Sequence, residues 1–168
     1  MKKITSILLV FTFIIVGCSV SYKFNGASIN YEETPDIDIR DFQNQAPLVD
    51  PTLIPTFNER MKDVFTRNTK LRFTTVNPSL ELEGEIIRYY LMPLSVKEDN
   101  FSAQTRLTME VKYRYRNNKN PADDKEETIS AYRDFDSNLM LTDVQESLNR
   151  QLTEDIVDQI FNATMSNW

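Results

Sequence analysis

The sequence predicts an α+β fold, a two-layer sandwich in which a mostly antiparallel sheet of four to five strands carries two amphipathic helices on one face. Residues 101–116 alternate apolar and polar side chains without interruption, which is typical of a strand with one buried face. Two other segments, one beginning between Pro51 and Pro55 and one spanning 142–163, repeat apolar side chains at intervals of three and four residues. That spacing is typical of amphipathic helices, and two such helices can cover one face of one sheet.

The composition fits one folded domain and excludes several classes of function. The chain has 168 residues, of which 40% are hydrophobic and only three are glycine. Its net charge is −6, and removal of the first 17 residues, which hold two lysines and no acid, leaves −8. An acidic chain of this kind lacks the basic footprint that nucleic-acid binding requires. A single cysteine forms no intrachain disulfide and no cysteine-based zinc site.

Residues 1–17 have the features of a lipoprotein signal peptide. Lys2 and Lys3 precede an apolar stretch, Ile7–Val16, that is too short to span a bilayer as an ordinary helix. The stretch ends in Ile15-Val16-Gly17-Cys18, which resembles a bacterial lipobox. We therefore predict that Cys18 is lipidated and anchors the protein to a membrane, since two or three acyl chains give stable anchoring. The alternative is an ordinary secretory signal followed by a chance cysteine.

The mature chain is predicted to comprise a lipidated tether, 18–35, and a single sandwich domain, 36–168. The residues after Cys18 are Ser19-Val20-Ser21, without the aspartate that retains many lipoproteins at the inner membrane. By resemblance to those sorting rules, we expect the protein on the periplasmic side of an outer membrane.

The first half of the domain is predicted to contain three strands and one helix. A short strand at 36–42 precedes the first helix, which ends near Asn68, and a strand at 71–76 follows it. The next strand, 80–91, begins with Leu80, Leu82 and Ile86 on one face and continues with Ile87, Tyr89 and Leu91 on the apolar side. This change of phase predicts either a β-bulge or a change in what covers the strand near residues 84–87.

The second half is predicted to contain two more strands and the second helix. The alternating strand 101–116 leads through a polar turn to a last strand, 126–135. Thr142 and Gln145 have the spacing of a capping box, which predicts that the second helix begins there.

The polar face of the 101–116 strand is rich in cations. Four basic side chains share this face with one acid, Glu110, and they are Arg106, Lys112, Arg114 and Arg116. One interpretation is a solvated sheet face that basic residues keep soluble. The other is an electropositive surface that binds an anionic ligand.

No pattern in the sequence indicates catalysis, a metal or a cofactor. The chain has no histidine, which removes the commonest general base and metal ligand. It also lacks a G-x-S-x-G nucleophile elbow and a glycine-rich phosphate loop. Asp36 and Asp38 have no further acids at metal-ligand spacing, and the acidic group at 123–127 is typical of a solvated loop.

Several segments resemble the LPS-assembly lipoprotein family, LptE. The likeness lies in the order of elements after the lipobox and in five segments: Tyr22–Gly26, Ile37–Ile39, Pro51 with Leu53, Phe57–Asp63 and Phe65–Thr69. The resemblance implies a lipoprotein that sits largely inside the outer-membrane β-barrel LptD, helps it assemble, and presents a surface to lipopolysaccharide. It also implies that basic residues contact the ligand. The strand pattern, and not the family resemblance, is the basis for predicting ligand contact at four residues: Arg106, Lys112, Arg114 and Arg116. The rival interpretation is a non-catalytic periplasmic lipoprotein that chaperones or pilots another outer-membrane complex.

Overall fold

The fold is that of a computed structural model, which describes residues 29–48, 50–94 and 103–165. Along the chain these residues form β1 (Asp36–Ile39), β2 (Gln43–Asn44), α2 (Leu53–Asn68), β3 (Arg72–Phe73), β4 (Leu80–Leu94), β5 (Gln104–Asn117), a 3₁₀ turn (Pro121–Asp123), β6 (Lys125–Asp136) and α3 (Leu141–Met165). The chain is therefore α+β, as predicted. The predicted lipidation site Cys18 lies outside the described residues.

Three long strands form the centre of the sheet. β4, β5 and β6 follow one another as an antiparallel meander, with Val111 of β5 opposite Ile86 of β4 and Ile129 of β6. The register of β4 against β5 shifts between Ile86 and Arg88, which confirms the predicted bulge. The extra residue moves the buried positions of β4 from the even-numbered Leu80, Leu82 and Ile86 to the odd-numbered Tyr89.

The rest of the sheet is parallel, which corrects the prediction of a mostly antiparallel sheet of four to five strands. The sheet has six strands in the described residues; β1 pairs in parallel with β3 and β4, and β2 pairs in parallel with β4. Parallel neighbours need a crossover connection, and α2 provides it between β2 and β3. Apolar alternation identifies a strand but says nothing of the direction of its neighbour.

The first predicted strand, 36–42, is also interrupted. Ile39 lies opposite Leu82 and Gln43 opposite Glu85, so the chain of β1 and β2 has one residue more than β4 over this stretch. The backbone of Phe42 turns away and bonds instead to the Asn58 side chain of α2, which accepts from its N–H at 2.8 Å and donates to its C=O at 3.2 Å. The Phe42 side chain thereby enters the core with Ile37 and Ile39, whereas uninterrupted alternation over the predicted strand 36–42 would place it on the opposite side.

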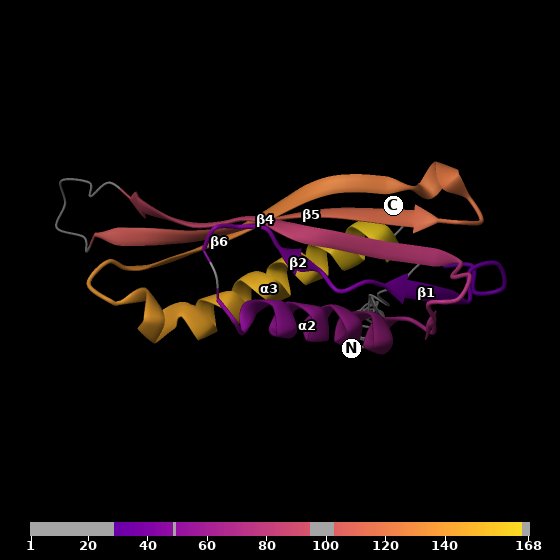
Figure 1. The fold of residues 1–168 in the computed structure, drawn as a ribbon, viewed down its shortest axis with the longest axis horizontal. Coiled ribbons are helices and arrows are strands. Elements are labelled where there is room, and N and C mark those ends of the chain that lie inside the picture. Colours follow the sequence, from indigo (N-terminus) through magenta and orange to yellow (C-terminus); the bar gives the residue numbers. More distant parts are fainter. Residues whose placement is uncertain (1–28, 49, 95–102, 166–168) are drawn as a thin grey trace, which may run out of the picture.

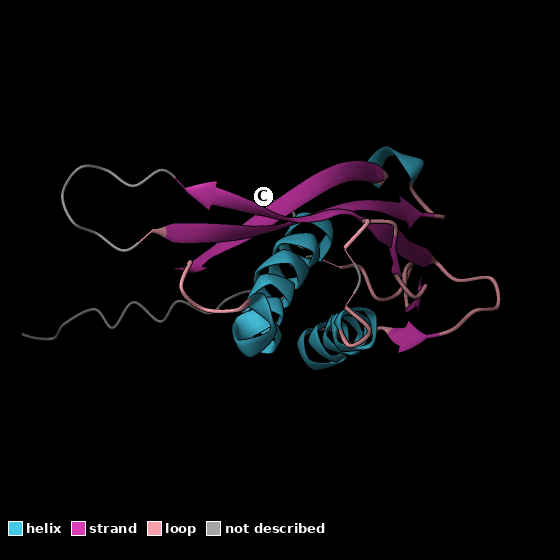
Figure 2. Cartoon of the chain, turned by 60° about the vertical axis from the view of Figure 1, so that its left-hand side comes forward, coloured by secondary structure: helices cyan, strands magenta, loops and turns pink. Residues whose placement is uncertain are grey.

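Both helices lie on one face of the sheet, as predicted, and leave the other face uncovered (Figure 1). α2 buries Phe57, Met61 and Phe65, and α3 buries a stripe at intervals of four residues: Leu148, Leu152, Ile156 and Ile160. The helices contact each other through the Phe65 and Phe161 rings, whose centroids are 5.2 Å apart. The turned view shows the two helices side by side beneath the strands (Figure 2). None of the described helices is long and apolar enough to cross a membrane.

The predicted capping box at the start of α3 is wrong. α3 begins at Leu141, so Thr142 lies within the first turn, and its hydroxyl contacts only the neighbouring Asp143 carboxylate at 3.5 Å. The predicted strand 71–76 is reduced to Arg72–Phe73, because the chain bends immediately after it.

A buried polar cluster ties α3 to the sheet. The Tyr89 hydroxyl of β4 donates to Asn149 Oδ1 at 2.7 Å and accepts from Gln145 at 3.0 Å. Asn149 in turn donates to Asp50, in the loop before α2, at 2.7 Å. Burial raises the pKa of Tyr89. Because every member of this cluster has a partner, it can sit in the core without the cost of an unpaired polar group.

Candidate functional site

The uncovered sheet face carries the predicted basic row. The even-numbered residues of β5 from Gln104 to Arg116 point away from the helices, whereas Leu107, Met109, Val111 and Tyr113 are buried beneath them. Arg106, Lys112, Arg114 and Arg116 therefore share one face, as the alternation predicts. The structure does not bring all four cations together, since they follow one another along a single long strand.

Neighbouring strands place carboxylates beside most of these cations. Glu126 of β6 accepts from Lys112 at 2.7 Å and from Arg114 at 3.1 Å, and Arg114 also lies 3.4 Å from Glu83 of β4. The hydrogen bonds from Lys112 and Arg114 lower the pKa of Glu126. Two cations thus share one fully ionised carboxylate near the middle of the strand.

Arg106 is held more firmly than the other cations of the row. Its guanidinium makes two hydrogen bonds to Asp134 of β6, at 2.7 and 2.9 Å, and lies 3.7 Å from the ring centroid of Tyr132. The hydrogen bond from Arg106 is the main cause of the lowered pKa of Asp134. A bidentate, stacked arginine of this kind is fixed in place and largely neutralised.

Arg116 differs from the other three. It lies opposite Glu81 in the register of β4 and β5, but among the described residues it forms no ion pair. It is exposed, so its charge is available to a ligand.

Sequence reasoning missed Arg40, which adds a further cation to this face. Arg40 follows β1, and its guanidinium lies 2.6 Å from Glu83, 3.4 Å from Glu81 and 3.5 Å from Asp38. The coulombic effect of Glu83 raises its pKa further. Glu81, Glu83 and Glu85 alternate along β4, and this alternation was the available signal that acids would face the basic row.

A shallow depression of about 330 Å³ lies where these charges meet. The side chains of Arg40, Lys112 and Arg114 line it together with Glu83, Glu85 and Glu126. Gly84 forms part of its floor, and a Cβ there would collide with the Phe42 ring and the Lys112 carbonyl oxygen. Glycine at this position therefore lets the Phe42 ring pack directly against β4 beneath the charged surface.

The far end of the same face is aromatic and apolar. Tyr90 and Met92 of β4 and Tyr132 of β6 are 38%, 43% and 52% exposed, and they flank Arg106 and the buried Thr108. The open face thus changes from charged to apolar along the strands.

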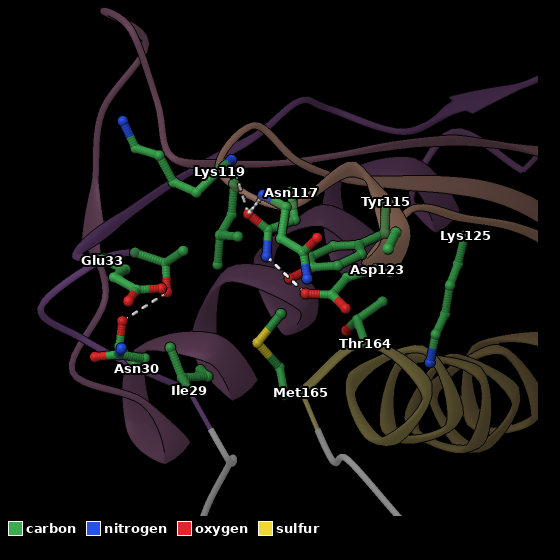
Figure 3. Close-up of a pocket in the computed structure, with 14 residues that line it drawn as sticks. Ile29, Asn30, Glu33, Tyr115, Asn117, Lys119, Asp123, Lys125, Thr164 and Met165 are labelled. Carbon is green, nitrogen blue, oxygen red and sulfur yellow. Dashed lines mark hydrogen bonds between the residues drawn. The ribbon is translucent and has the colours of Figure 1, made fainter.

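A second cavity, of about 310 Å³, lies at the end of the sandwich where residues 29–34, the β5–β6 turn and the end of α3 meet (Figure 3). Its polar groups already bond to one another. The Asn117 amide donates to Asp123 at 2.9 Å, and Lys125 donates to the Ala163 carbonyl. Burial raises the pKa of the lining Tyr115 to about 12. Two of the polar side chains that line the cavity, Asn117 and Lys125, are therefore engaged within the protein.

The described residues hold no cluster of three or more metal-binding side chains. Asp36, considered above as a metal ligand, instead accepts from the Ser79 N–H at 2.8 Å and lies 3.6 Å from Arg72. Asp38 lies beside Arg40. Both carboxylates therefore make contacts that stabilise the fold.

Comparisons with known proteins identify related chains. The profile of the family described as "LptE: Lipopolysaccharide-assembly" matches residues 34–164. No curated protein sequence matches. Among solved structures, a minor lipoprotein from Acinetobacter baumannii is 13% identical with a TM-score of 0.50, covering 76% of this chain and 90% of its own. A homolog of neuraminyllactose-binding hemagglutinin from Helicobacter pylori is 8% identical with a TM-score of 0.57, covering 86% and 90%. At these identities the two structures show a shared fold alone.

Proposed function

Because the chain belongs to the LptE family of lipopolysaccharide-assembly lipoproteins, we propose that it is a partner of the outer-membrane barrel LptD that helps deliver lipopolysaccharide to the outer leaflet. The observation that carries this proposal is the family match, which spans almost the whole described domain. In this role the protein plugs the barrel, assists its assembly and performs no catalysis of its own. Neither a cofactor nor a nucleic acid is involved.

The shape of the domain supports a place inside a barrel. The sheet and both helices extend along one common long axis, and the molecule is narrow across it (Figure 1). A long, narrow two-layer body can enter a lumen that would exclude a compact one of the same volume.

The uncovered sheet face supports contact with lipopolysaccharide. The lipid anchor of lipopolysaccharide carries phosphates, which arginine and lysine bind well. Arg116 is unpaired within the described residues, and Lys112 and Arg114 share the single carboxylate of Glu126. A phosphate carries more negative charge than Glu126 and can compete for these cations. We assign the phosphate contact to Lys112, Arg114 and Arg116, and we assign Arg106 a positioning role because Asp134 and Tyr132 already hold it.

Membrane attachment through Cys18 completes the proposal. Residues 29–34, where the described chain begins, lie at the same end of the sandwich as the end of α3 (Figure 3). A tether from Cys18 therefore reaches the domain at one end of its long axis. This arrangement suits a protein anchored on the periplasmic side of the outer membrane.

Co-purification of the full-length lipoprotein from detergent-solubilised outer membranes tests the proposal. We expect LptD as the dominant partner, in near-equal amount. Recovery of a different outer-membrane complex, with no LptD, would support the pilot function instead. Solubilised membranes from cells that lack the lipoprotein serve as the control for non-specific recovery.

A further inference from the structure

The two edges of the sheet differ greatly in length. The strand order β3-β1-β4-β5-β6 places β3 at one edge and β6 at the other. β3 has two residues, whereas β6 has twelve and pairs with β5 over nearly its whole length in one continuous register. Among the described residues, no strand pairs with the outer side of β6, and its place at the margin of the sheet is visible in Figure 1.

The register shows which backbone groups of β6 point outward. The N–H of Ser137 donates to the carbonyl of Ala103, directly opposite, at 2.9 Å. Residues that lie opposite each other in an antiparallel ladder alternate between hydrogen-bonded and non-hydrogen-bonded pairs. Because Ser137 belongs to a hydrogen-bonded pair, the other odd-numbered residues of β6 also make their main-chain hydrogen bonds to β5. The even-numbered residues from Glu126 to Asp134 then direct their N–H and C=O groups away from the sheet. The Arg133 guanidinium accordingly reaches the Tyr132 carbonyl at 2.9 Å.

The middle of this edge lacks the devices that protect exposed strands, although charged side chains lie at both of its ends. Proteins usually shield an edge with proline, a bulge, a very short strand or charged side chains. β6 contains no proline and no register shift, and residues 128–132 are uncharged. Thr128, Ser130 and Tyr132 are all exposed. The Arg133 side chain is held on the helix side by Asp155 at 2.6 Å and by Gln151 at 2.9 Å, both on α3.

We propose that the outer edge of β6, residues 126–134, receives an extended segment of the barrel partner by strand addition. This inference rests on the proposed function for the source of the segment. The main-chain groups of β6 provide the affinity, and alternate side chains provide specificity. Strands in the barrel wall are already paired with one another, so the added segment is a loop or terminal extension of the barrel protein.

Charge on the open face favours a different chain over a second copy. Two copies of β6 paired antiparallel with the longest overlap, centred on Ser130, would place Glu126 opposite Asp134 at two positions on the open face. The same register would place Glu127 opposite Arg133 at two positions on the helix face, where Arg133 already pairs with Asp155. Like charges directly opposite one another destabilise strand pairs. The incoming segment is therefore expected to carry lysine, arginine or hydroxyl side chains on the side of the open sheet face, opposite Glu126 and Asp134.

Substitution of Ser130 tests the edge with a matched control. Ser130→Pro removes one outward N–H without removing a bond to β5, and proline is tolerated at such edge positions. Ser130→Ala removes the hydroxyl and keeps the N–H. In co-purification from solubilised outer membranes, we expect Ser130→Pro to reduce LptD recovery roughly fivefold to tenfold, as loss of one or two main-chain hydrogen bonds implies. Ser130→Ala, which keeps every main-chain group, should recover clearly more LptD than Ser130→Pro. A folded Ser130→Pro variant that recovers LptD normally would overturn the inference.

Amide hydrogen exchange of the unmodified protein gives an independent reading, which holds even if Ser130→Pro does not fold. The amides of Thr128, Ser130 and Tyr132 should exchange quickly in the free lipoprotein and become protected in the LptD complex. Unchanged exchange in an intact complex would overturn the strand addition and leave the proposed function standing. Absence of any LptD complex would overturn both. Protection that appears in the lipoprotein alone and grows with its concentration would identify a second copy as the occupant, against the inference.

Discussion

At Glu126, two cations of β5, Lys112 and Arg114, pair with one carboxylate. An anionic ligand that binds the open face has to compete with Glu126 for these two cations. Lys112 and Arg114 are 46% and 43% exposed, so water and ligand reach both. An exposed ion pair contributes little to stability, with a median of about 0 to 1 kcal/mol. The pairs can therefore be rearranged at small cost to the fold.

Reversal of both charges should weaken lipopolysaccharide binding. We expect the double variant Lys112→Glu with Arg114→Glu to bind at least about tenfold more weakly, because two charge-assisted contacts to phosphate are replaced by repulsion. Glu126→Gln should bind more tightly than the unmodified protein, because it frees Lys112 and leaves Arg114 with only its longer contact to Glu83. Binding to purified lipopolysaccharide can be measured by titration of the soluble domain, residues 19–168.

The control for this prediction is Arg67→Glu with Arg150→Glu, which changes the net charge equally on the helical layer, where both arginines are exposed. If both double variants lose affinity to the same extent, the effect comes from net charge and the assignment to β5 fails.

Asp36 should make the fold sensitive to acid. The Ser79 N–H bond is the main cause of the lowered pKa of Asp36, whose ordinary value is 3.8. A carboxyl with a lowered pKa in the folded state stabilises the fold above its ordinary pKa, and this contribution is lost as pH falls through the folded value. The melting temperature of the unmodified protein should therefore exceed that of Asp36→Asn above about pH 4. The difference should shrink at lower pH; a difference independent of pH would contradict the assignment.

At the scale of elements, the contact between α3 and the sheet depends on a polar group as well as on apolar packing. Asn149 is 4% exposed and bonds to both Tyr89 and Asp50. Asn149→Ala should lower the free energy of unfolding by about 1 to 3 kcal/mol, because it removes two hydrogen bonds and leaves the buried Tyr89 hydroxyl without the acceptor for its proton. Urea denaturation measures this loss. Arg150→Ala, exposed on the next position of the helix, should change stability by less than about 0.5 kcal/mol.

Elements with long periodic patterns could be predicted from the sequence, whereas their pairing could not. The 101–116 alternation and the α3 stripe each extend over many residues, so chance interruptions do not hide them. β2 and β3 have two residues each, too few to show a period. The bulge in β4 was predictable because it moves the apolar side from Ile86 to Tyr89.

The same reasoning explains what was missed at the candidate site. The alternation of β5 correctly placed Arg106, Lys112, Arg114 and Arg116 on one face. A single strand pattern does not reveal which residues of other strands lie opposite. Glu83, Glu126 and Asp134 therefore became neighbours of the basic row only in the folded sheet. The single-strand charge count overestimated how positive the face is.

At the scale of the whole molecule, membrane attachment should depend on one side chain outside the described residues. Cys18→Ser should release the protein from the membrane fraction and remove the mass of the acyl chains, because the acyl chains on this cysteine provide the anchor. Fractionation and intact-mass measurement check this. Ser19→Ala, next in the chain, should remain attached and lipidated. A Cys18→Ser variant that stays in the membrane without its partner would contradict the anchor.

The position of β1 between β3 and β4 has a consequence for the order in which the chain acquires its structure. β4, β5 and β6 join neighbours in sequence, whereas β1 must wait for β4, more than forty residues later. Distant pairings form slowly. β1 therefore stays without its β4 partner until α2 and the start of β4 are beside it. Until then Ile37 and Ile39 have no β4 strand to pair with, so the rate of folding, rather than the stability of the finished fold, sets how long these side chains are exposed.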